Sequence, residues 1–240
     1  MSIDKNNLPL HVAFILDGNG RWAEKRKLSR SAGHDEGLKT IKKIVKDACD
    51  LGIKYITLYV FSTENWKRTQ DEVGFLMNLI HIHLRNELTF YKENKIKLNH
   101  LGDINALPKN IQSDIINAMD DTKSFDKMTV NLAINYGGRD EILRGIKKLF
   151  NKKKDLSDFS EKDFSEYLDM KESPDVDLVI RTGGEQRLSN FLLWHVPYAE
   201  FIYSDTLWPD YTKDEFYRHI EEFQHRNRRF GAEKSRKQET

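Results

Sequence analysis

Short apolar runs alternate with longer amphipathic segments along most of the chain. Val12 to Leu16 is apolar at consecutive positions and rich in branched side chains, which is typical of a strand buried on both faces of a parallel sheet. Comparable runs recur between segments with helical spacing. The pattern predicts further strands at Tyr55 to Phe61, Lys95 to Leu101, Thr129 to Asn135, Asp177 to Ile180 and Phe201 to Tyr203.

Apolar residues three or four positions apart predict the helices. Gly33 to Leu51 has one apolar face of this kind. Gly52 follows directly, and glycine is common at the position that ends a helix. Asp71 to Tyr91 is expected to be one long helix with two apolar faces. Pro108 suits the first turn of a helix that runs to about Ser124. Further helices are expected after Gly137-Gly138 and near Lys213 to Arg228.

The alternation of strands and helices predicts an α/β fold. We expect a mostly parallel sheet of about six strands, flanked by helices and joined by right-handed crossovers. A chain of 240 residues with 38% hydrophobic side chains can bury a complete core as one domain. We therefore expect a single domain over 1–240, with a polar tail from about residue 232 that lies outside the fold.

Charge and cysteine content narrow the function classes. Lys and Arg number 39 against 38 Asp and Glu, so the chain lacks the basic field of a nucleic-acid-binding protein and any anion site must be local. The single Cys49 lies in an apolar periodic segment, which predicts a buried thiol in a reducing compartment. Residues 1–8 lack the apolar run of a signal peptide, and no segment is apolar for long enough to span a bilayer. We expect a cytoplasmic protein.

Asp17 follows the first predicted strand and begins the stretch Asp17-Gly18-Asn19-Gly20-Arg21-Trp22-Ala23. Ligands of parallel sheets bind at the carboxyl ends of the strands. Gly18 and Gly20 bring bare N–H groups close to a ligand, and the helix that follows adds the positive end of its dipole. With Arg21, these groups predict an anion site. Because a carboxylate lies beside it, a cation is expected between them, and the stretch predicts a diphosphate with Mg²⁺.

Other interpretations of the stretch at 17–23 remain open from these residues alone. Gly18 to Ala23 matches the G-x-G-x-x-A pattern of dinucleotide-binding proteins. That pattern needs an acid about 20 residues later at the end of a second strand, whereas Asp35 and Glu36 fall in helical sequence. The chain has no Walker phosphate loop. A solvated turn with a surface arginine is the alternative without a ligand.

Polar residues follow three of the predicted strands. Asp17, Ser62 and Arg181 stand at carboxyl ends, which meet along one edge of a parallel sheet. One planar guanidinium group can bind two phosphate oxygens at once. Several arginines in one cleft therefore suit a ligand set with two diphosphate groups. The residues expected in this common cleft are Arg21, Arg30, His34, Arg68, Arg181 and Arg187.

Five motifs then occur in order. The first is the stretch at 17–23, and Arg30 with Gly33-His34 is the second. The others are Phe61-Ser62-Thr63-Glu64-Asn65-Trp66 with Arg68, Asn135-Tyr136-Gly137-Gly138-Arg139, and 177–190 followed by Trp208-Pro209-Asp210. Over nearly the whole chain, this series resembles the cis-prenyltransferases of the undecaprenyl diphosphate synthase type.

The resemblance implies a homodimeric enzyme that adds isopentenyl diphosphate repeatedly to an allylic diphosphate primer such as farnesyl diphosphate, forming Z double bonds. In bacteria the product is the lipid carrier of cell-wall sugars, which implies peripheral membrane contact for its release. The resemblance places Asp17 and Asn65 in catalysis, and Asp17 and Glu200 at Mg²⁺. It places Gly18, Asn19, Gly20, Arg21, Arg30 and His34 at the allylic diphosphate, Arg181, Arg187 and Ser189 at isopentenyl diphosphate, and Trp22, Ser62, Thr63, Glu64, Trp66, Arg68 and Leu188 at further substrate contacts.

The implied chemistry agrees with most of these residue types. Ionisation of an allylic diphosphate needs charge on the leaving group to be neutralised, which Mg²⁺, arginines and loop N–H groups do. An amide is not basic, so Asn65 is expected to position the substrate, with the released diphosphate as the proton sink. Trp22, Trp66 and Phe61 are expected to supply dry apolar space.

The helix expected at 71–91 has a second apolar face, formed by Phe75, Leu79 and Ile82. It could line a cavity for an apolar ligand, pack against a second subunit or be ordinary core. We predict that at least one face of this helix lines an apolar product tunnel, because a growing polyprenyl chain needs a dry space.

Three histidines and the C-terminal motif complete the predictions. His195 stands where family members commonly have Gln, and we expect a hydrogen-bonded structural histidine there. His81 and His83 face different ways on a helix, so a zinc site is not expected. Arg229-Phe230-Gly231 resembles a segment that in relatives reaches the partner's site, with a frayed end as the alternative.

The rival function is a non-catalytic subunit of the same fold that binds lipid or supports a partner. Such relatives lose active-site charges, whereas Asp17, Arg30, Arg181, Arg187 and Glu200 are all present. A dinucleotide-dependent oxidoreductase is a more distant alternative.

Overall fold

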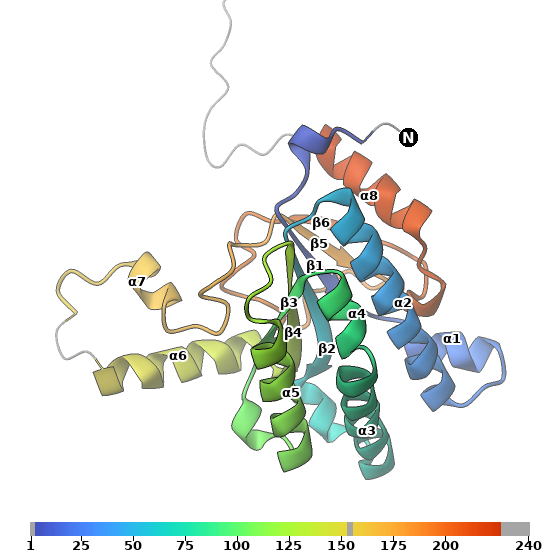
Figure 1. The fold of residues 1–240 in the computed structure, drawn as a ribbon, viewed down its shortest axis with the longest axis horizontal. Helices are drawn as coiled ribbons and strands as arrows, with labels where there is room; N and C mark the ends of the chain where they lie inside the picture. Colours follow the sequence, from blue (N-terminus) through green and yellow to red (C-terminus); the bar gives the residue numbers. More distant parts are fainter. Residues whose placement is uncertain (1–2, 153–155, 227–240) are drawn as a thin grey trace, which may run out of the picture.

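Six parallel strands form one sheet in the order β3-β4-β2-β1-β5-β6 (Figure 1). The structure is a computed structural model that describes residues 3–152 and 156–226. The α/β fold with a parallel sheet is confirmed. The strands are β1 (His11–Ile15), β2 (Tyr55–Ser62), β3 (Ile96–Leu101), β4 (Met128–Tyr136), β5 (Leu178–Arg181) and β6 (Glu200–Tyr203).

The strand order places β1 at a switch point. From β1 the chain adds β2 on one side, and later crosses over to add β5 on the other side. Connections leave β1 and β5 in opposite directions, so a crevice opens at the carboxyl ends of the central strands. The segment after β1, which begins at Asp17, enters this crevice.

Helices cover the sheet mainly on one face. They are α1 (Asn19–Lys25), α2 (Arg30–Leu51), α3 (Gln70–Asn86), α4 (Leu88–Glu93), α5 (Lys109–Thr122), α6 (Gly138–Lys152), α7 (Glu161–Ser165) and α8 (Lys213–His225). Short 3-10 turns lie at η1 (Lys5–Asn7), η2 (Thr63–Lys67), η3 (Ile104–Ala106) and η4 (Trp208–Asp210). The largest core cluster lies between the sheet and α2, α3, α5 and α8, whose apolar faces it joins.

The second face of the sheet is covered mostly by irregular segments. Met170, Val176, Phe191 and Leu192 are buried against Ala13 and its neighbours on this side. α6 and α7 extend to one side of the molecule, away from α2 and α3 (Figure 1). They enclose a smaller apolar cluster of their own.

Buried polar side chains cross the second face from strand to strand. His11 Nε2 and Thr57 Oγ1 lie 2.7 Å apart, and Asn131 Nδ2 donates to the same oxygen at 3.1 Å. Asn99 Nδ2 donates to Asn131 Oδ1 at 3.2 Å. These residues belong to β1, β2, β4 and β3. Because buried polar groups must be paired, this row of bonds favours one register of the four strands.

Helix boundaries differ from the predictions in three places. The helix expected at 71–91 is two helices, because Glu87 leaves helical geometry at φ −96° and ψ 1°. Neither glycine nor proline marks this break, so the periodicity of the sequence gave no sign of it. Pro108 precedes α5 as its N-cap instead of opening its first turn. α7 was not predicted at all, since its five residues are too few for a periodic signal.

Two local predictions are confirmed. Gly52 ends α2 in the left-handed region, at φ +110°. Cys49 is a buried free thiol. The motif at 229–231 and the polar tail expected from about residue 232 lie outside the described residues.

Candidate active site

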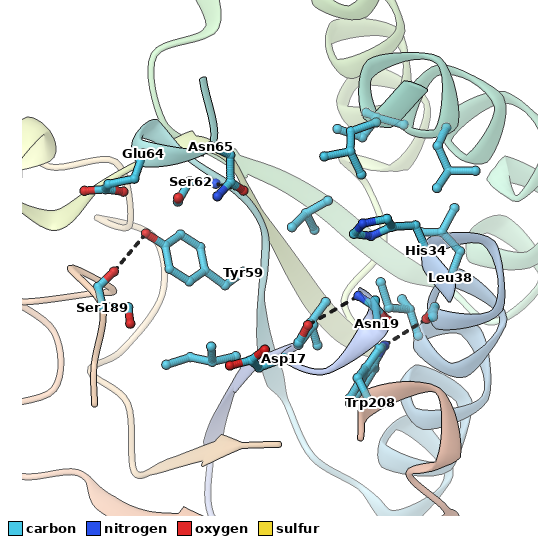
Figure 2. Close-up of a pocket in the computed structure, with 18 of the residues that line it drawn as sticks. Asp17, Asn19, His34, Leu38, Tyr59, Ser62, Glu64, Asn65, Ser189 and Trp208 are labelled. Atoms are coloured by element: carbon cyan, nitrogen blue, oxygen red, sulfur yellow. Dashed lines mark hydrogen bonds between the residues drawn. The ribbon is translucent and has the colours of Figure 1, made fainter. Parts of the chain in front are cut away.

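A cavity of about 580 Å³ opens at the carboxyl ends of β1 and β2, between α2 and α3. One side is polar, and Figure 2 shows Asp17, Glu64 and Asn65 there, with Ser189 nearby. The remaining wall is largely aliphatic. Its apolar residues are Ile15, Leu16, Leu38, Ile41, Val60, Leu76, Leu79 and Ile80. The space therefore matches a ligand with a charged head and a hydrocarbon tail.

Asp17 holds two arginines at the polar end of the cavity. Its Oδ2 accepts a hydrogen bond from Arg181 Nη2 at 2.9 Å, and its Oδ1 accepts one from Arg21 Nη2 at 3.1 Å. Arg181 is only 4% exposed. Its Nη1 donates to Ser189 Oγ at 2.8 Å and to the carbonyl of Arg187. A buried cation is thus fixed beside a strand-end carboxylate, as the sequence predicted.

Arg181 also keeps an unused donor. Its Nε is buried and has no hydrogen-bond partner among the described residues. A buried donor without a partner is costly, so an acceptor such as a phosphate oxygen would stabilise it.

Glycines allow the first loop to pack closely. Gly18 is left-handed at φ +114°, and a β-carbon there would lie 2.9 Å from Leu207. Gly183, at φ +85°, leaves room for the Arg21 guanidinium, which would lie 2.6 Å from a β-carbon. The bare backbone at these two positions is therefore what brings Arg21 next to Asp17.

Asn65 presents a donor to the cavity. Its Oδ1 accepts a hydrogen bond from the Ser62 N–H at 3.1 Å, which leaves the amide NH₂ as the outward group. An NH₂ group can bind an oxyanion but cannot accept a proton. The geometry therefore favours the positioning role predicted for Asn65 over a role as base.

Glu64 lies next to Asn65 and lines the same cavity. Its Oε1 accepts a hydrogen bond from Asn190 Nδ2 at 2.8 Å, and its Oε2 accepts one from Thr63 Oγ1 at 3.2 Å. Burial alone would raise the pKa of the Glu64 carboxyl, but these hydrogen bonds hold the pKa below its ordinary value. Glu64 is thus ionised at neutral pH.

His34 faces the cavity from α2. Burial, reinforced by the Arg68 guanidinium, lowers the pKa of His34 to about 4, although Glu72 at 3.9 Å opposes the shift. Arg68 Nη1 donates to Glu72 at 2.8 Å. Without a ligand, His34 is therefore neutral at physiological pH, and a bound anion would favour its charged form.

The predicted arginines do not all share one cleft. Arg68 and Arg181 line the main cavity. Arg21 and Arg30 line an adjacent depression of about 360 Å³ with Gly20. Arg187 has a 61% exposed side chain whose Nη1 donates to Glu185 at 2.5 Å. The expectation of one common cleft is wrong, because these arginines are divided between two adjacent hollows and an exposed position.

The expected apolar contribution of Trp22, Trp66 and Phe61 is also wrong, since none of the three lines the cavity. Trp22 Nε1 donates to Asp210 at 2.7 Å, outside α1. Trp66 Nε1 donates to Asn135 at 2.7 Å, and its ring packs edge-on against buried Phe61. The hydrogen bonds of the two indole N–H groups orient both rings away from the cavity. Leu188 packs against the core of the second face instead.

Glu200 lies at the opposite end of the sheet from Asp17. It is the first residue of β6 and pairs in register with Leu178, the first residue of β5. Asp17 lies two residues beyond Ile15, which pairs with the last residue of β5. Roughly 16 Å of strand rise separates the two levels. Glu200 accepts from Arg226 Nη1 at 2.9 Å, so the fold of one copy does not bring the two predicted Mg²⁺ ligands to one ion.

Comparison with known proteins decides the family. Residues 15–231 match the family model described as "Putative undecaprenyl diphosphate synthase". The chain belongs to this family of cis-prenyltransferases. It is 55% identical over 221 residues to an isoprenyl transferase from Treponema denticola, covering 92% of this chain and 96% of the relative.

Solved cis-prenyltransferase structures share the fold. Lavandulyl diphosphate synthase from Lavandula x intermedia, in complex with dimethylallyl diphosphate, matches with a TM-score of 0.91 and 33% identity, covering 95% of this chain and 100% of the other. A probable undecaprenyl diphosphate synthase from Campylobacter jejuni matches with a TM-score of 0.80 and 38% identity, covering 94% of this chain and 100% of the other. The chain is a prenyltransferase enzyme, as its motifs predicted.

His195 of this prenyltransferase is the structural histidine that was predicted. Its Nε2 lies 3.2 Å from Glu141 Oε1, and its Nδ1 lies 3.6 Å from Asp175. Burial alone would lower the pKa of His195, but the two carboxylates raise it to about 9. Its charged form therefore stabilises the fold fully below the unfolded pKa near 6.5, and this contribution is lost as pH rises through about 9.

Replacing His195 by glutamine should therefore destabilise the protein in a pH-dependent way. The loss in unfolding free energy should be about 3 kcal/mol near pH 6 and should shrink between pH 6.5 and 10. Denaturant unfolding of both proteins at several pH values measures it. His100→Gln is the control: burial lowers the pKa of His100, so its wild-type contribution should fall at low pH instead. A pH-independent difference for His195→Gln would contradict the assignment.

The other two histidines of the sequence analysis, His81 and His83, contact different groups. His81 bonds Asp114, and His83 Nε2 lies 3.1 Å from the hydroxyl of buried Tyr91. Within the described ranges, no three His, Cys, Asp or Glu residues gather as they would around a metal ion. In the same ranges, no helix is long and apolar enough to cross a membrane.

The cavity includes residues that the sequence analysis did not select. Leu38 and Ile41 lie on the apolar face predicted for the helix at 33–51, and periodicity alone does not separate core from cavity wall. Tyr59 lines the cavity and donates to the carbonyls of Tyr136 and Ser189, each at 3.3 Å. Asn190 lies at the end of the last motif, where its position beside Ser189 was the available signal.

Proposed function

We propose that this prenyltransferase condenses isopentenyl diphosphate repeatedly onto an allylic diphosphate, with farnesyl diphosphate as primer and Z double bonds in the product. One observation carries the proposal. A single cavity joins a cationic, hydrogen-bonding end at Asp17 and Arg181 to an aliphatic wall on α2 and α3. A diphosphate head with a growing hydrocarbon tail is the ligand class that uses both parts.

Different cavity residues act on the two substrates of the condensation. The allylic C1–oxygen bond breaks, C4 of isopentenyl diphosphate bonds to C1, and a proton leaves C2 of the second substrate. We infer that the departing diphosphate lies where the two hollows adjoin, bound by Arg21 and Arg30 of the depression and by His34 of the main cavity, whose Asp17 contacts Arg21. Arg181 and Ser189 bind the second substrate. Asn65 orients a phosphate oxygen through its NH₂, and the released diphosphate accepts the proton.

Mg²⁺ fits the donors at Asp17. Mg²⁺ is usually bound by one or two carboxylates together with substrate phosphates, and not by a cage made only of protein ligands. The Asp17 carboxylate at the polar end of the cavity meets that requirement. Each Asp17 oxygen accepts one arginine and keeps acceptor capacity. We propose that Asp17 holds Mg²⁺ against the allylic diphosphate, where the ion neutralises charge on the leaving group.

We further propose that the aliphatic wall begins a tunnel for the product. Leu76, Leu79 and Ile80 of α3 face Leu38 and Ile41 of α2 across the cavity. A chain that lengthens by five carbons per cycle can extend between these helices without meeting water. A polyprenyl product of this kind suits the lipid carrier of cell-wall sugars, and peripheral contact with a bilayer would release it.

A homodimer is proposed as the working form. Leu143 and Phe150 are 58% and 72% exposed on α6, which extends from the body of the molecule. Large apolar side chains exposed on one helix mark an interaction surface. A second copy would cover them, and sedimentation at several protein concentrations measures the association.

Diphosphate release tests the proposed reaction. Purified protein should release diphosphate only when isopentenyl diphosphate, farnesyl diphosphate and Mg²⁺ are all present, and chelation of the metal should stop the release. A non-catalytic subunit would release none under any combination. Release from farnesyl diphosphate alone at the full rate would indicate hydrolysis and contradict the proposed condensation.

A further inference from the structure

Asn190 lies where the loops after β2, β4 and β5 meet. Its Nδ2 donates to Glu64 Oε1 at 2.8 Å, and its Oδ1 accepts from the Arg139 N–H at 3.0 Å. Its carbonyl accepts from the Gly138 N–H at 2.7 Å. One side chain and one carbonyl thus connect the turn η2, the start of α6 and the loop that carries Ser189.

The backbone at this point is held in an uncommon conformation. Ser189 has φ +52° and Asn190 has φ +63°, both in the left-handed region. Asparagine tolerates this region better than most residues, and serine does so less well. Surrounding contacts must therefore keep the pair in place, and the hydrogen bonds of Asn190 to η2 and to the start of α6 do so.

This conformation sets the geometry of the buried arginine. It directs Ser189 Oγ toward Arg181 Nη1, at 2.8 Å, while Arg181 Nη2 contacts Asp17 at 2.9 Å. On the other side, the amide of Asn190 holds the Glu64 carboxylate beside Asn65. Asn190 therefore touches both groups of residues that line the polar end of the cavity.

We propose that Asn190 is a positioning residue for isopentenyl diphosphate, acting through Glu64 and Ser189. The inference rests on the proposed function, which assigns that substrate to Arg181 and Ser189. Without the amide, the three loops populate arrangements in which Ser189 and Glu64 are displaced. The apparent affinity falls in proportion to the fraction of molecules that remain competent.

The first experiment separates the amide from the backbone. Asn190→Ala should raise KM for isopentenyl diphosphate by roughly tenfold or more, as expected for a lost hydrogen bond to a charged group, and should change KM for farnesyl diphosphate and kcat much less. Asn190→Gly keeps the left-handed backbone but lacks the amide, and should raise KM equally. A glycine variant with wild-type KM would show that only backbone conformation matters, and would overturn the proposal.

Asn99→Ala is the matched control. It removes an amide that donates to Asn131 within the sheet, far from the polar end of the cavity. It should lower the melting temperature and leave KM for isopentenyl diphosphate unchanged. A KM increase in both variants would show that the effect of Asn190→Ala comes from a general loss of stability, and would contradict the proposal.

The second experiment exchanges donor and acceptor. Asn190→Asp keeps an acceptor for the Arg139 N–H but sets a carboxylate against Glu64, and should raise KM more than alanine does. Combining it with Glu64→Gln restores one donor and one acceptor across the same contact with the total charge unchanged. The pair should have a lower KM than Asn190→Asp alone, because the contact between the two side chains is restored. A pair no better than the worse single variant would contradict the proposed contact.

A binding measurement keeps the inference separate from the proposed function. Inorganic diphosphate should raise the melting temperature of the wild type, and of Asn99→Ala by the same amount, but raise that of Asn190→Ala less. Equal stabilisation of the Asn190→Ala variant and the wild type would overturn the positioning role of Asn190 even if condensation occurs. Absence of condensation in the wild type would contradict the proposed function. The binding result would then decide separately whether Asn190 positions the diphosphate site.

Discussion

Replacing Asp17 by asparagine is expected to lower kcat by roughly a hundred- to a thousandfold, the usual cost of removing one electrostatic contact to the transition state. The change removes the charge that would hold Mg²⁺ at the leaving diphosphate. It keeps an oxygen that Arg181 Nη2, now at 2.9 Å, can still contact. Steady-state kinetics at saturating Mg²⁺ measure the effect, and KM for both substrates should change by only about threefold.

Asparagine is a sharper test than alanine at this position. Arg181 is 4% exposed, so Asp17→Ala would leave a buried cation without its carboxylate and would lower stability as well as activity. Asp121→Asn is the control, because it removes the charge from an exposed pair with Lys92 at 2.6 Å. It should leave kcat unchanged. Wild-type turnover in Asp17→Asn would refute the assignment of the metal to this carboxylate.

Leu79→Trp is expected to shorten the products while leaving the first condensation nearly unchanged. Leu79 is a buried residue of α3 that lines the aliphatic wall of the cavity. A larger ring there fills space that the growing chain needs, but it touches none of the polar residues that bind diphosphate. Thin-layer or mass analysis of extracted products, together with the initial rate of the first addition, measures both effects.

Ile82→Trp is the control on the same helix. Ile82 is 43% exposed and does not line the cavity, although the sequence pattern placed it on the same face as Leu79. Its replacement should leave product length unchanged. If Leu79→Trp instead weakens association and lowers every step together, this part of α3 packs against a second subunit and the tunnel lies elsewhere.

The strands and the first loop could be predicted because local sequence determines them. Val12 to Leu16 has no polar side chain, and Gly18 adopts the left-handed conformation, at φ +114°, that glycine favours. The placement of Asp17 at a strand end followed directly from these two features. Its contact with Arg181, 164 positions away, followed from the parallel sheet, since both residues stand at carboxyl ends.

Other features depended on tertiary packing. Glu200 was placed at Mg²⁺ by the resemblance alone. In one copy of the chain it begins β6 in register with Leu178, at the opposite end of the sheet from Asp17. Trp22 was expected at the cavity because tryptophan is largely apolar. Its N–H instead donates to Asp210, 188 positions later, and the ring does not line the cavity. No residue near Glu87 signals the break between α3 and α4. The break accompanies the burial of Tyr91 in α4, which depends on how the core packs.

The structure of the product tests the central claim most directly. Labelled isopentenyl diphosphate and farnesyl diphosphate should be incubated with the protein and Mg²⁺, and the extracted lipid analysed by mass spectrometry and NMR. The account predicts polyprenyl diphosphates that differ by five carbons, with Z geometry at every double bond that the enzyme adds. Products with E geometry at those bonds, or no product longer than the primer, would contradict it.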